Sequence, residues 1–373
     1  MAMEYRTLGR TGLKVSVVGL GSLSYLRADS TAEDVEQMTD RAAEGGINIL
    51  DTAYAYGHGK IDKMIGRAIQ KNRSRWVIIS RSHRRDPREF SESMEETFKN
   101  LQTDVFDVFQ LHDITNPKDY EATKEPGSIY DIALQAKKDG RVRFVGISTH
   151  ANTDIVRDMI ESDRYDVITI SYNAANCQRS PGDGENIART AEEILPLAKS
   201  RGIGITIMKP YGGGSLVQER PGPDGAKTSI PPIQLLKFCI ANPNVDSVTP
   251  GVENIEQVDT AISAGQTGAG ITQQQIKKLK ELISVWGADF CRRCGYCLPC
   301  SEGIAIPTAM RVLEMFKTSQ VGKAKDSYAK LDPKPDVCTE CNECVERCPY
   351  SLSIPEKMKE LTRNAEGKEC VGM

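Results

Sequence analysis

Apolar and polar positions follow two different periods along the first 285 residues of the chain. Short runs rich in Val, Ile, Leu and Thr predict eight strands, and segments with apolar residues at helical spacing separate them. The strands cover residues 15–19, 47–51, 76–80, 105–111, 143–148, 167–171, 204–208 and 246–250, and helical periodicity covers 32–44, 91–101, 129–138, 191–199 and 233–240. Eight strand–helix units in fewer than 300 residues predict an α/β fold, the TIM (β/α)8 barrel. A doubly wound sheet shares this local pattern and is the alternative fold.

Two further segments frame the predicted barrel. Residues 5–8 and 13–15, joined across Gly9 to Gly12, predict a hairpin that closes the barrel floor. Residues 272–286 predict an extra helix that leads toward a cysteine-rich end. We therefore expect two domains, a barrel over residues 1–286 and a small domain over residues 287–373.

Eight of the eleven cysteines lie in two dense runs of the second predicted domain. Closely spaced thiolates on a tight loop offer three ligands to one [4Fe-4S] cube, while a fourth cysteine reaches the other cube. The spacing predicts two [4Fe-4S] clusters in a ferredoxin-like domain. In such modules the first three cysteines of each run share a cube with the last cysteine of the other run. The two runs are Cys291-x2-Cys294-x2-Cys297-x2-Cys300 and Cys338-x2-Cys341-x2-Cys344-x3-Cys348.

Zinc and disulfides are the alternatives for these cysteines. Structural zinc usually takes two separated Cys-x2-Cys pairs, whereas here four sulfurs lie within about ten residues, twice. A disulfide framework suits a secreted domain, but residues 1–19 show no charged start followed by an apolar stretch. Free thiolates predict a reducing, anaerobic cytoplasm. Similar sequences at 303–307 and 351–355, each followed by a helix-like segment, indicate that the cluster-binding unit is duplicated.

Composition excludes two classes of partner. The 373 residues are 39% hydrophobic, and their formal net charge of -3 leaves no general basic surface for a nucleic acid. No apolar run reaches the ~18 residues that a membrane-spanning helix needs, so we expect no membrane association. The sequence leaves the oligomeric state undetermined.

The four histidines of the chain stand where predicted strands end. His58, His83, His112 and His150 follow or end the second to fifth strands. In a TIM barrel the loops after the strands share one mouth, so these residues predict a pocket with titrating groups. A packed or solvated histidine is the alternative at each position. The basic segment 82–86 could hold an anion at the same mouth or be a solvated loop.

Several segments of the barrel resemble the aldo-keto reductase family. They lie at 50–57, 107–112, 145–148, 6–13 and 250–251 and so cover the barrel from end to end. Joined to two cysteine runs, the chain resembles the iron-sulfur-containing branch of that family. The resemblance implies hydride transfer from a nicotinamide to a carbonyl group, with a tyrosine that gives its proton to the developing alkoxide.

The family's catalytic residues map onto four positions of this sequence. Tyr56 matches the proton donor, His112 the histidine that orients the carbonyl, and Asp51 the buried carboxylate. Arg81 stands where the family has a lysine that eases ionisation of the tyrosine, whose pKa is ~10 as a free phenol. An arginine keeps the positive charge and can pair with Asp51, but it does not release its proton. A purely structural ion pair is the alternative role of Asp51 and Arg81.

The nicotinamide contacts of the family are only partly present, so NAD(H) or NADP(H) is a possible cofactor. Where the family holds the carboxamide with Ser-Asn and Gln, this chain has Ser148, Thr149 and Thr169, and Met208 replaces the aromatic residue that stacks on the ring. Residues 250–257 carry no basic side chain for the 2′-phosphate of NADP. Backbone N–H groups of a glycine-rich loop and of a helix N-terminus could hold a pyrophosphate. These positions are Gly212, Gly213, Ser215, Gly251 and Asn254.

Three functions remain open from the sequence. A nicotinamide gives two electrons at once, whereas an iron-sulfur cube passes one at a time. The chain is first of all predicted to act on a small carbonyl or hydroxyl compound as an oxidoreductase, with Tyr56 as proton donor and the clusters as electron relay. The clusters could instead reduce a substrate in the barrel directly, without nicotinamide. In the third hypothesis the chain is an electron-transfer subunit whose barrel docks a partner. A ferredoxin or a flavoprotein is the expected electron partner.

Overall fold

The structure is a computed structural model that describes most of the chain. The described residues are 2–150, 153–177, 190–222, 226–268, 270–286, 290–291, 297–317, 321–348 and 350–367. The chain divides into two compact units. The first contains Met1–Ala174, Arg189–Pro210 and Pro232–Ile276, and the second contains Ala175–Ala188, Tyr211–Pro231 and Lys277–Met373. The segment after the seventh barrel strand thus belongs to the second unit, while the domain boundary at residue 286 stays a prediction.

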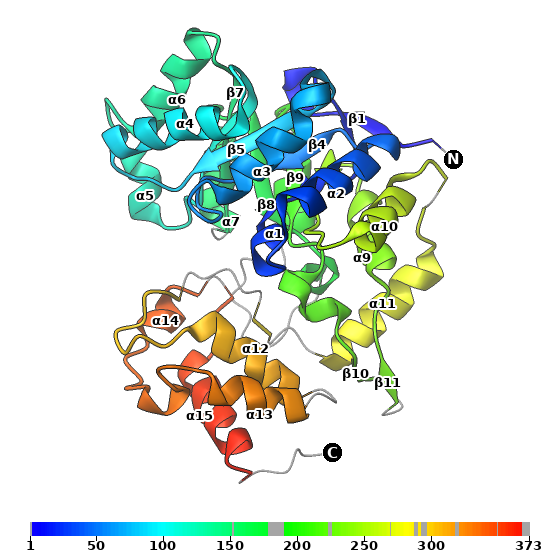
Figure 1. Ribbon diagram of the computed structural model, residues 1–373, viewed down its shortest axis with the longest axis vertical. Helices are drawn as coiled ribbons and strands as arrows, with labels where there is room; N and C mark the ends of the chain where they lie inside the picture. Colours follow the sequence, from blue (N-terminus) through cyan, green and yellow to red (C-terminus); the bar gives the residue numbers. More distant parts are fainter. Residues whose placement is uncertain are drawn as a thin grey trace. The chain divides into compact units, whose positions relative to one another are not determined.

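The first unit is built on eight parallel strands that follow one another around a barrel (Figure 1). They are β3 (Leu20–Gly21), β4 (Ile49–Asp51), β5 (Val77–Ser82), β6 (Phe106–Leu111), β7 (Val142–Thr149), β8 (Val167–Ser171), β9 (Gly204–Met208) and β12 (Ser247–Val248). Parallel bridges from Val18 to Val248 and from Gly21 to Gly251 join the first strand to the last. A Cβ on Gly21 would lie 2.9 Å from the carbonyl oxygen of Thr249, so this junction requires glycine. The predicted TIM barrel is confirmed.

The hairpin at the barrel floor is confirmed, but it changes the boundary of the first strand. β1 (Tyr5–Thr7) pairs antiparallel with β2 (Lys14–Ser16), which takes the beginning of the run predicted as a barrel strand. Residues 15 and 16 of the predicted barrel strand thus belong to the hairpin, Val18 makes an isolated parallel bridge with Val248, and the barrel strand begins at Leu20. Leu8, Leu13 and Val15 of the hairpin are buried in a cluster with apolar residues of β4, β5, β6 and β8. The hairpin thus covers the floor of the barrel.

Helices follow the strands as the apolar periodicity predicts. α2 (Ala32–Glu44) begins with a capping box between Thr31 and Asp34, and α4 (Pro87–Leu101) begins at Asp86, whose side chain accepts two backbone N–H groups. The helix predicted over 191–199 is instead a π-helical turn, η4 (Thr190–Ile194), followed by α8 (Leu195–Ser200), and Pro196 has no N–H to continue the ladder. The other helices of this unit are α1 (Leu23–Arg27), α3 (Lys60–Ile69), α5 (Pro117–Ala122), α6 (Ile129–Lys138), α7 (Thr153–Glu161), α9 (Pro232–Ile240) and α10 (Ile255–Gly265).

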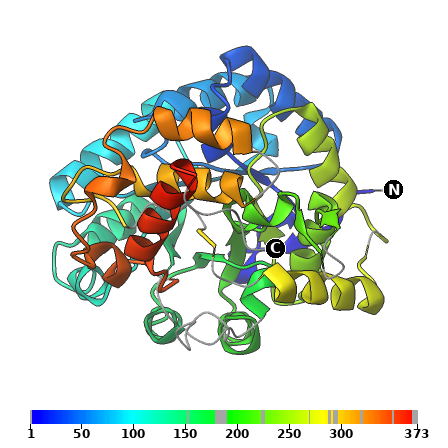
Figure 2. The same cartoon turned by 90° about the horizontal axis from the view of Figure 1, so that it is seen from below.

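The second unit is mainly helical, and its sequence duplication appears in the backbone. α12 (Ile306–Phe316) and α15 (Ile354–Ala365) both begin with proline in the first turn and lie side by side (Figure 1, Figure 2). Their capping residues, Ala305 and Ser353, have ψ of 68° and φ of -74° and -70°. The remaining elements of this unit are β10 (Arg220–Pro221), β11 (Lys227–Thr228), α13 (Val321–Ala329), α14 (Glu343–Glu346) and two short 3-10 helices, η5 (Gly212–Val217) and η6 (Pro335–Val337). α11 (Gln273–Trp286) spans the division between the units. No helix in the described ranges is long and apolar enough to cross a membrane.

Candidate functional site

Asp51 and Arg81 form a buried ion pair at the C-terminal ends of β4 and β5. Their exposed fractions are 6% and 1%, and the Arg81 Nη2 atom donates to Asp51 Oδ2. Burial raises the pKa of the Asp51 carboxyl, and the charge and hydrogen bond of Arg81 oppose this rise. The Arg81 Nε atom is buried and has no hydrogen-bond partner among the described residues, so the pairing is not bidentate. The ion pair predicted from the sequence is therefore present, and the Nε–H of Arg81 is the buried donor that it leaves unused.

Tyr56 and His112 lie against each other at the ends of β4 and β6. Their ring centroids are 6.1 Å apart and the rings are nearly perpendicular, at 85°. The backbone N–H of His112 donates to the carbonyl of Ser82 at 2.9 Å, which fixes the residue to the end of β5. Burial, followed by the charge of Arg81, holds the pKa of His112 well below its usual range. The imidazole is therefore neutral at pH 7 and can offer a hydrogen bond without adding charge.

The other histidines of the mouth make different contacts. His83 stacks on Tyr54 at 6.4 Å between centroids, and His58 meets the same ring edge-on at 6.4 Å. The Tyr54 hydroxyl donates to Glu96 Oε2 at 2.7 Å, which anchors this group to α4. His150, after β7, lies 3.0 Å from the ammonium group of Lys209. The expected gathering of histidines thus resolves into an aromatic group around Tyr54, His112 against Tyr56, and His150 beside Lys209.

The basic segment after β5 serves largely to hold loops together. Arg85 donates to the carbonyl oxygens of His83, His112 and Asp113 at 2.7–3.0 Å and to Asp119 Oδ2 at 2.9 Å. These bonds join the loops that follow β5 and β6. Arg85 thus holds the backbone of His112 in place, which favours a structural role for this segment.

The side chains predicted to bind the nicotinamide carboxamide form hydrogen bonds to other residues of the barrel. Ser148 Oγ accepts the N–H of Asp113 at 3.1 Å, and the Thr149 hydroxyl donates to the carbonyl of Ile114 at 2.6 Å. Thr169 exchanges hydrogen bonds with Gln110 at 2.9 and 3.1 Å inside the barrel. These side chains therefore stabilise the strands and the loop that follows β6.

Three other predicted cofactor positions also have structural roles or lie at the mouth. Gly251 bridges Gly21 where the barrel closes, and the Asn254 side chain caps α10 by accepting the N–H of Gln257 at 3.0 Å. Met208 ends β9 with a partly exposed side chain. The predicted helix start near Asn254 is confirmed, and its role toward a cofactor stays a prediction.

The glycine-rich loop after β9 is packed within the second unit. Gly212 and Gly213 have φ of 58° and 71°, which favour glycine, and a Cβ on Gly212 would lie 3.0 Å from the Phe290 ring. The Ser215 hydroxyl donates to the carbonyl of Cys291 at 3.2 Å. The loop predicted to hold a pyrophosphate is thus fixed to the start of the first cysteine run.

A largely buried ion pair also joins this loop region to α12. Arg220 Nη2 donates to Glu314 Oε2 of α12, and the two side chains are 12% and 7% exposed. The Arg220 guanidinium also lies 5.4 Å from the centroid of Phe290. The segment 211–220 and the cysteine-rich segment therefore form one packed structure.

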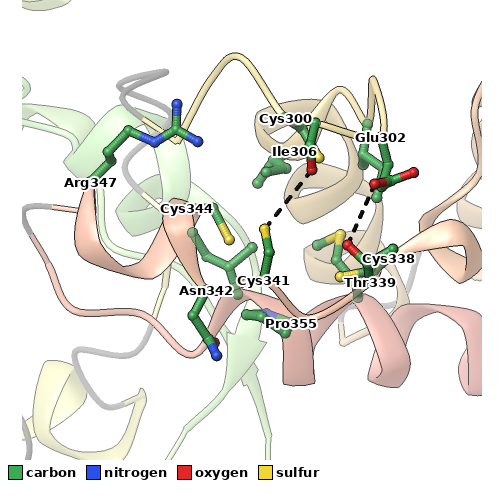
Figure 3. A pocket seen from close by; sticks show the side chains of 14 residues that line it. Cys300, Glu302, Ile306, Cys338, Thr339, Cys341, Asn342, Cys344, Arg347 and Pro355 are labelled. Carbon is green, nitrogen blue, oxygen red and sulfur yellow. Dashed lines mark hydrogen bonds between the residues drawn. The ribbon is translucent and has the colours of Figure 1, made fainter.

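Four cysteines line a single pocket of the second unit (Figure 3). They come from both runs and are Cys300, Cys338, Cys341 and Cys344. The space is about 370 Å³, including the part open to solvent, and its lining also includes Ile304, Ile306, Ile354 and Met358. Burial raises the pKa of the Cys344 thiol, and the neighbouring thiolates of Cys338 and Cys341 raise it further. Mutual repulsion of thiolates in an apolar pocket is relieved by a cationic iron centre, so this donor set fits a [4Fe-4S] cube.

The remaining predicted ligands gather on the same core. Cys297 is 7% exposed and belongs to the apolar cluster that Cys344 also enters, and Cys291 and Cys348 pack against that cluster. Cys294 lies outside the described residues. Among the residues that are described, no three His, Cys, Asp or Glu side chains could share one metal ion. A cube spreads its four thiolates over four iron atoms, so it accepts a wider donor set than a single zinc ion does.

Comparison with known proteins agrees with this geometry. Residues 17–232 match the model of the Aldo/keto reductase family. The chain belongs to this family. Residues 290–353 match the 4Fe-4S dicluster domain, so an aldo/keto reductase barrel and a dicluster domain occur in one polypeptide. The protein is therefore an oxidoreductase of aldo/keto reductase type.

The similarity to known proteins extends over about three quarters of this chain and over nearly the whole length of each relative. L-galactose dehydrogenase of Arabidopsis thaliana is 28% identical over 322 residues, which are 75% of this chain and 94% of that protein. An aldo-keto reductase from Bacillus halodurans, solved in its holo form, has a TM-score of 0.60 at 25% identity and covers 74% of this chain and 96% of its own. An aldo-keto reductase from Klebsiella pneumoniae, solved with NADPH, has a TM-score of 0.59 at 19% identity, with coverages of 76% and 95%, and supports the fold alone.

The structure also places at the barrel mouth a residue that the sequence did not predict as part of the site. Lys209 directly follows β9, and its ammonium group reaches His150 at the end of β7. A lysine immediately after a predicted barrel strand was the available signal, because such positions lie at the mouth. Its spacing from His150 in the sequence, 59 residues, gives no indication of the contact.

Proposed function

We propose that the protein interconverts a small carbonyl compound and the corresponding hydroxyl compound, with Tyr56 as proton donor and iron-sulfur clusters as electron relay. The contact between Tyr56 and His112, at 6.1 Å between centroids, supports this proposal most directly. It brings a phenol and a neutral imidazole together after β4 and β6, the two strands on either side of β5. The similarity to a protein named L-galactose dehydrogenase agrees with such a substrate class.

Each residue of the site has a distinct part in this reaction. Reduction of a carbonyl to an alcohol consumes two electrons and two protons, and Tyr56 supplies the proton that reaches the oxygen. The hydrogen on the carbon would come as hydride from a nicotinamide or, when the clusters deliver the two electrons, as a proton from solvent. His112 stays neutral and donates a hydrogen bond to the same oxygen, which orients the carbonyl. Arg81 places a fixed positive charge beside the site, and Asp51 holds that guanidinium in place. Because Arg81 cannot release its proton, Tyr56 must regain its own from solvent or another group.

The second unit would hold the clusters with eight cysteines. Iron-sulfur clusters supply electrons one at a time when bound. Cys300, Cys338, Cys341 and Cys344 would hold one cube, as the pocket that they line supports. Cys291, Cys297 and Cys348, with Cys294, would hold the other. We propose that a ferredoxin or a flavoprotein loads them with electrons.

One observation favours direct electron delivery, without nicotinamide, as a second candidate. The side chains of Ser148 and Thr149 hold backbone groups of the loop after β6, and Thr169 bonds to Gln110. Binding of a carboxamide there would compete with these bonds, each of which contributes about 0.5–1.5 kcal/mol. A barrel without a nicotinamide would leave the mouth to the substrate alone.

Replacement of Tyr56 by Phe tests the proposed function. With the anaerobic, cluster-loaded protein and a panel of small aldehydes, ketones and alcohols, we expect Tyr56→Phe to lower turnover roughly 10²- to 10⁴-fold. Tyr54→Phe is the matched control, because Tyr54 lies two residues away and its hydroxyl bonds to Glu96. Turnover by Tyr56→Phe equal to that of the control would contradict the role of Tyr56.

An anaerobic titration separates the two candidates. NADH and NADPH are added to the full-length protein while cluster absorption and nucleotide fluorescence are recorded. Binding followed by bleaching of the clusters supports a nicotinamide site. If neither nucleotide binds while a low-potential dye sustains turnover, direct delivery of electrons is the better description.

A further inference from the structure

Ser301 lines the pocket of the second unit together with four cysteines. It directly follows Cys300 in the chain, and its Oγ atom lies 3.9 Å from the Sγ atom of Cys341, which belongs to the other cysteine run. A dashed line reaches this sulfur in Figure 3. Within the described ranges the Ser301 hydroxyl has no other hydrogen-bond partner. The contact therefore joins the two runs at the place where the donor set fits a cube.

The direction of this hydrogen bond is fixed once Cys341 binds iron. A cysteine binds a metal as the thiolate, which has no hydrogen to donate. The Ser301 hydroxyl is then the donor and the sulfur is the acceptor. Hydrogen bonds to the sulfurs of an iron-sulfur cluster are among the determinants of its reduction potential, because they stabilise the negative charge that an added electron brings. Ser301 is thus placed to act on the potential of the cube.

The loop that carries Cys341 is held against the first cysteine run. The Thr339 hydroxyl donates to Glu302 Oε1 at 3.5 Å, which is the second dashed line of Figure 3. Glu340 and Asn342, on either side of Cys341, have φ of 58° and 62°. These two left-handed residues turn the backbone before and after Cys341 and so set the direction of its side chain. The Ser301 hydroxyl therefore meets a sulfur whose place the loop determines.

The duplicated cluster-binding unit carries this hydroxyl only once. Cys300 and Cys348 are the last cysteines of the two runs. The residue after Cys300 is Ser301, whereas the residue after Cys348 is Pro349, which has no hydroxyl group. The amino-acid sequence thus makes the two predicted cubes unequal at this position, and a hydrogen bond of this kind would act on one of them.

We propose that Ser301 raises the reduction potential of the cube in this pocket by donating a hydrogen bond to the Cys341 sulfur. The inference rests on the proposed function for the ligands of the cube, and on the Ser301 contact for its potential. The ligands would be Cys300, Cys338, Cys341 and Cys344. A cube of higher potential holds an added electron more firmly, so the hydrogen bond favours electron transfer toward this cube from the other one.

Ser301→Ala removes the hydroxyl and tests the proposal. The full-length, cluster-loaded protein is titrated anaerobically with dithionite and redox mediators, and electron paramagnetic resonance of each reduced cube gives its midpoint potential. We expect Ser301→Ala to shift one reduction equilibrium about tenfold toward the oxidised form, which is about 59 mV for one electron, and to leave the other within about twofold. Ser301→Thr keeps a hydroxyl and should stay within about twofold of the wild type.

Ser353→Ala is the matched control, because it makes the same chemical change in the same unit. Ser353 caps α15 without a side-chain hydrogen bond, and the equivalent cap of α12 is Ala305, so alanine is compatible with such a position. Both potentials of this control should equal those of the wild type. Should Ser301→Ala lose iron, Ser301→Thr is compared with Ser301→Val, which has nearly the same shape and no hydroxyl.

Three outcomes would overturn the role of Ser301. They are unchanged potentials in Ser301→Ala, an equal shift of both cubes, and a shift in Ser301→Thr as large as that in Ser301→Ala. Cys344→Ser removes a ligand of the proposed cube and so identifies its signal. If this variant kept both signals, the ligand assignment would fail and the inference with it, whereas loss of one signal with unchanged potentials in Ser301→Ala contradicts the hydrogen bond alone. These measurements use no substrate and are independent of the role proposed for Tyr56.

Discussion

Arg81→Met is the sharpest perturbation of the site, because it leaves a buried carboxylate without its charge partner. Asp51 is 6% exposed and Arg81 is 1% exposed. Breaking such a pair from one side typically costs about 3–5 kcal/mol, since the remaining charge is desolvated and unpaired. For a unit of this size that corresponds to a melting temperature lower by about 6–20 °C.

The loss should depend on pH in a defined direction. Burial raises the pKa of Asp51, and without Arg81 the two interactions that oppose this rise are gone. A carboxyl whose folded-state pKa is raised contributes stability below its unfolded pKa, and this contribution is lost as the pH rises through the folded pKa. The deficit of Arg81→Met should therefore be larger near pH 7.5 than near pH 5.5.

Thermal unfolding of the anaerobic protein, followed by far-ultraviolet circular dichroism at both pH values, measures this effect. The double variant Asp51→Leu/Arg81→Met is the control, because an apolar pair of similar volume is often neutral or stabilising relative to a buried ion pair. A single variant within about 1 kcal/mol of wild type, or a double variant as unstable as the single one, would show that Asp51 is not left as an uncompensated buried charge.

Three further predictions concern other buried groups. Burial raises the pKa of Asp62 to about 6, so ionisation of this carboxyl lowers the stability of the folded protein as the pH rises from about 4 to 6. Thermal melts should therefore show Asp62→Asn to be more stable than the wild type at pH 8, by roughly 3 kcal/mol, but not at pH 4. Arg220→Gln should destabilise the second unit by about 3–5 kcal/mol and speed iron release, and Arg220→Gln/Glu314→Gln should recover most of this loss. Cys344→Ser should halve the iron content and remove one paramagnetic signal of the reduced protein, and a full complement of iron would remove Cys344 from the ligand set.

Much of the fold could be predicted because each strand and helix carries its own pattern. The helices at 32–44 and 129–138 were predicted to the residue, since a cap or a charged end coincides with the end of the apolar periodicity. The first strand was misplaced because residues 14–16 are equally suited to a floor hairpin, and only pairing with β1 decides between the two. Pro196 was the local signal that the helix predicted at 191–199 would change its geometry.

The candidate site, like the fold, was only partly predictable from the sequence. The family resemblance locates Asp51, Tyr56, Arg81 and His112 on the sequence. Each lies at or after the end of a strand, where parallel strands bring their C-terminal ends together. The contact of Lys209 with His150 joins residues 59 positions apart and could not be predicted, since it depends on the left-handed backbone of Lys209. The engagement of Ser148 and Thr149 by loop backbone groups likewise depends on neighbours from another loop.

Local period and spacing encode the strand–helix alternation and the two cysteine runs, so these features follow from the amino-acid sequence. The tertiary structure alone decided which groups share an environment. It packs the glycine-rich loop after β9 with Cys291 and Phe290, and it collects four cysteines of both runs in one pocket. The physical reason is that burial, charge coupling and hydrogen bonding depend on distances in space, which are fixed only when residues far apart in the chain pack together.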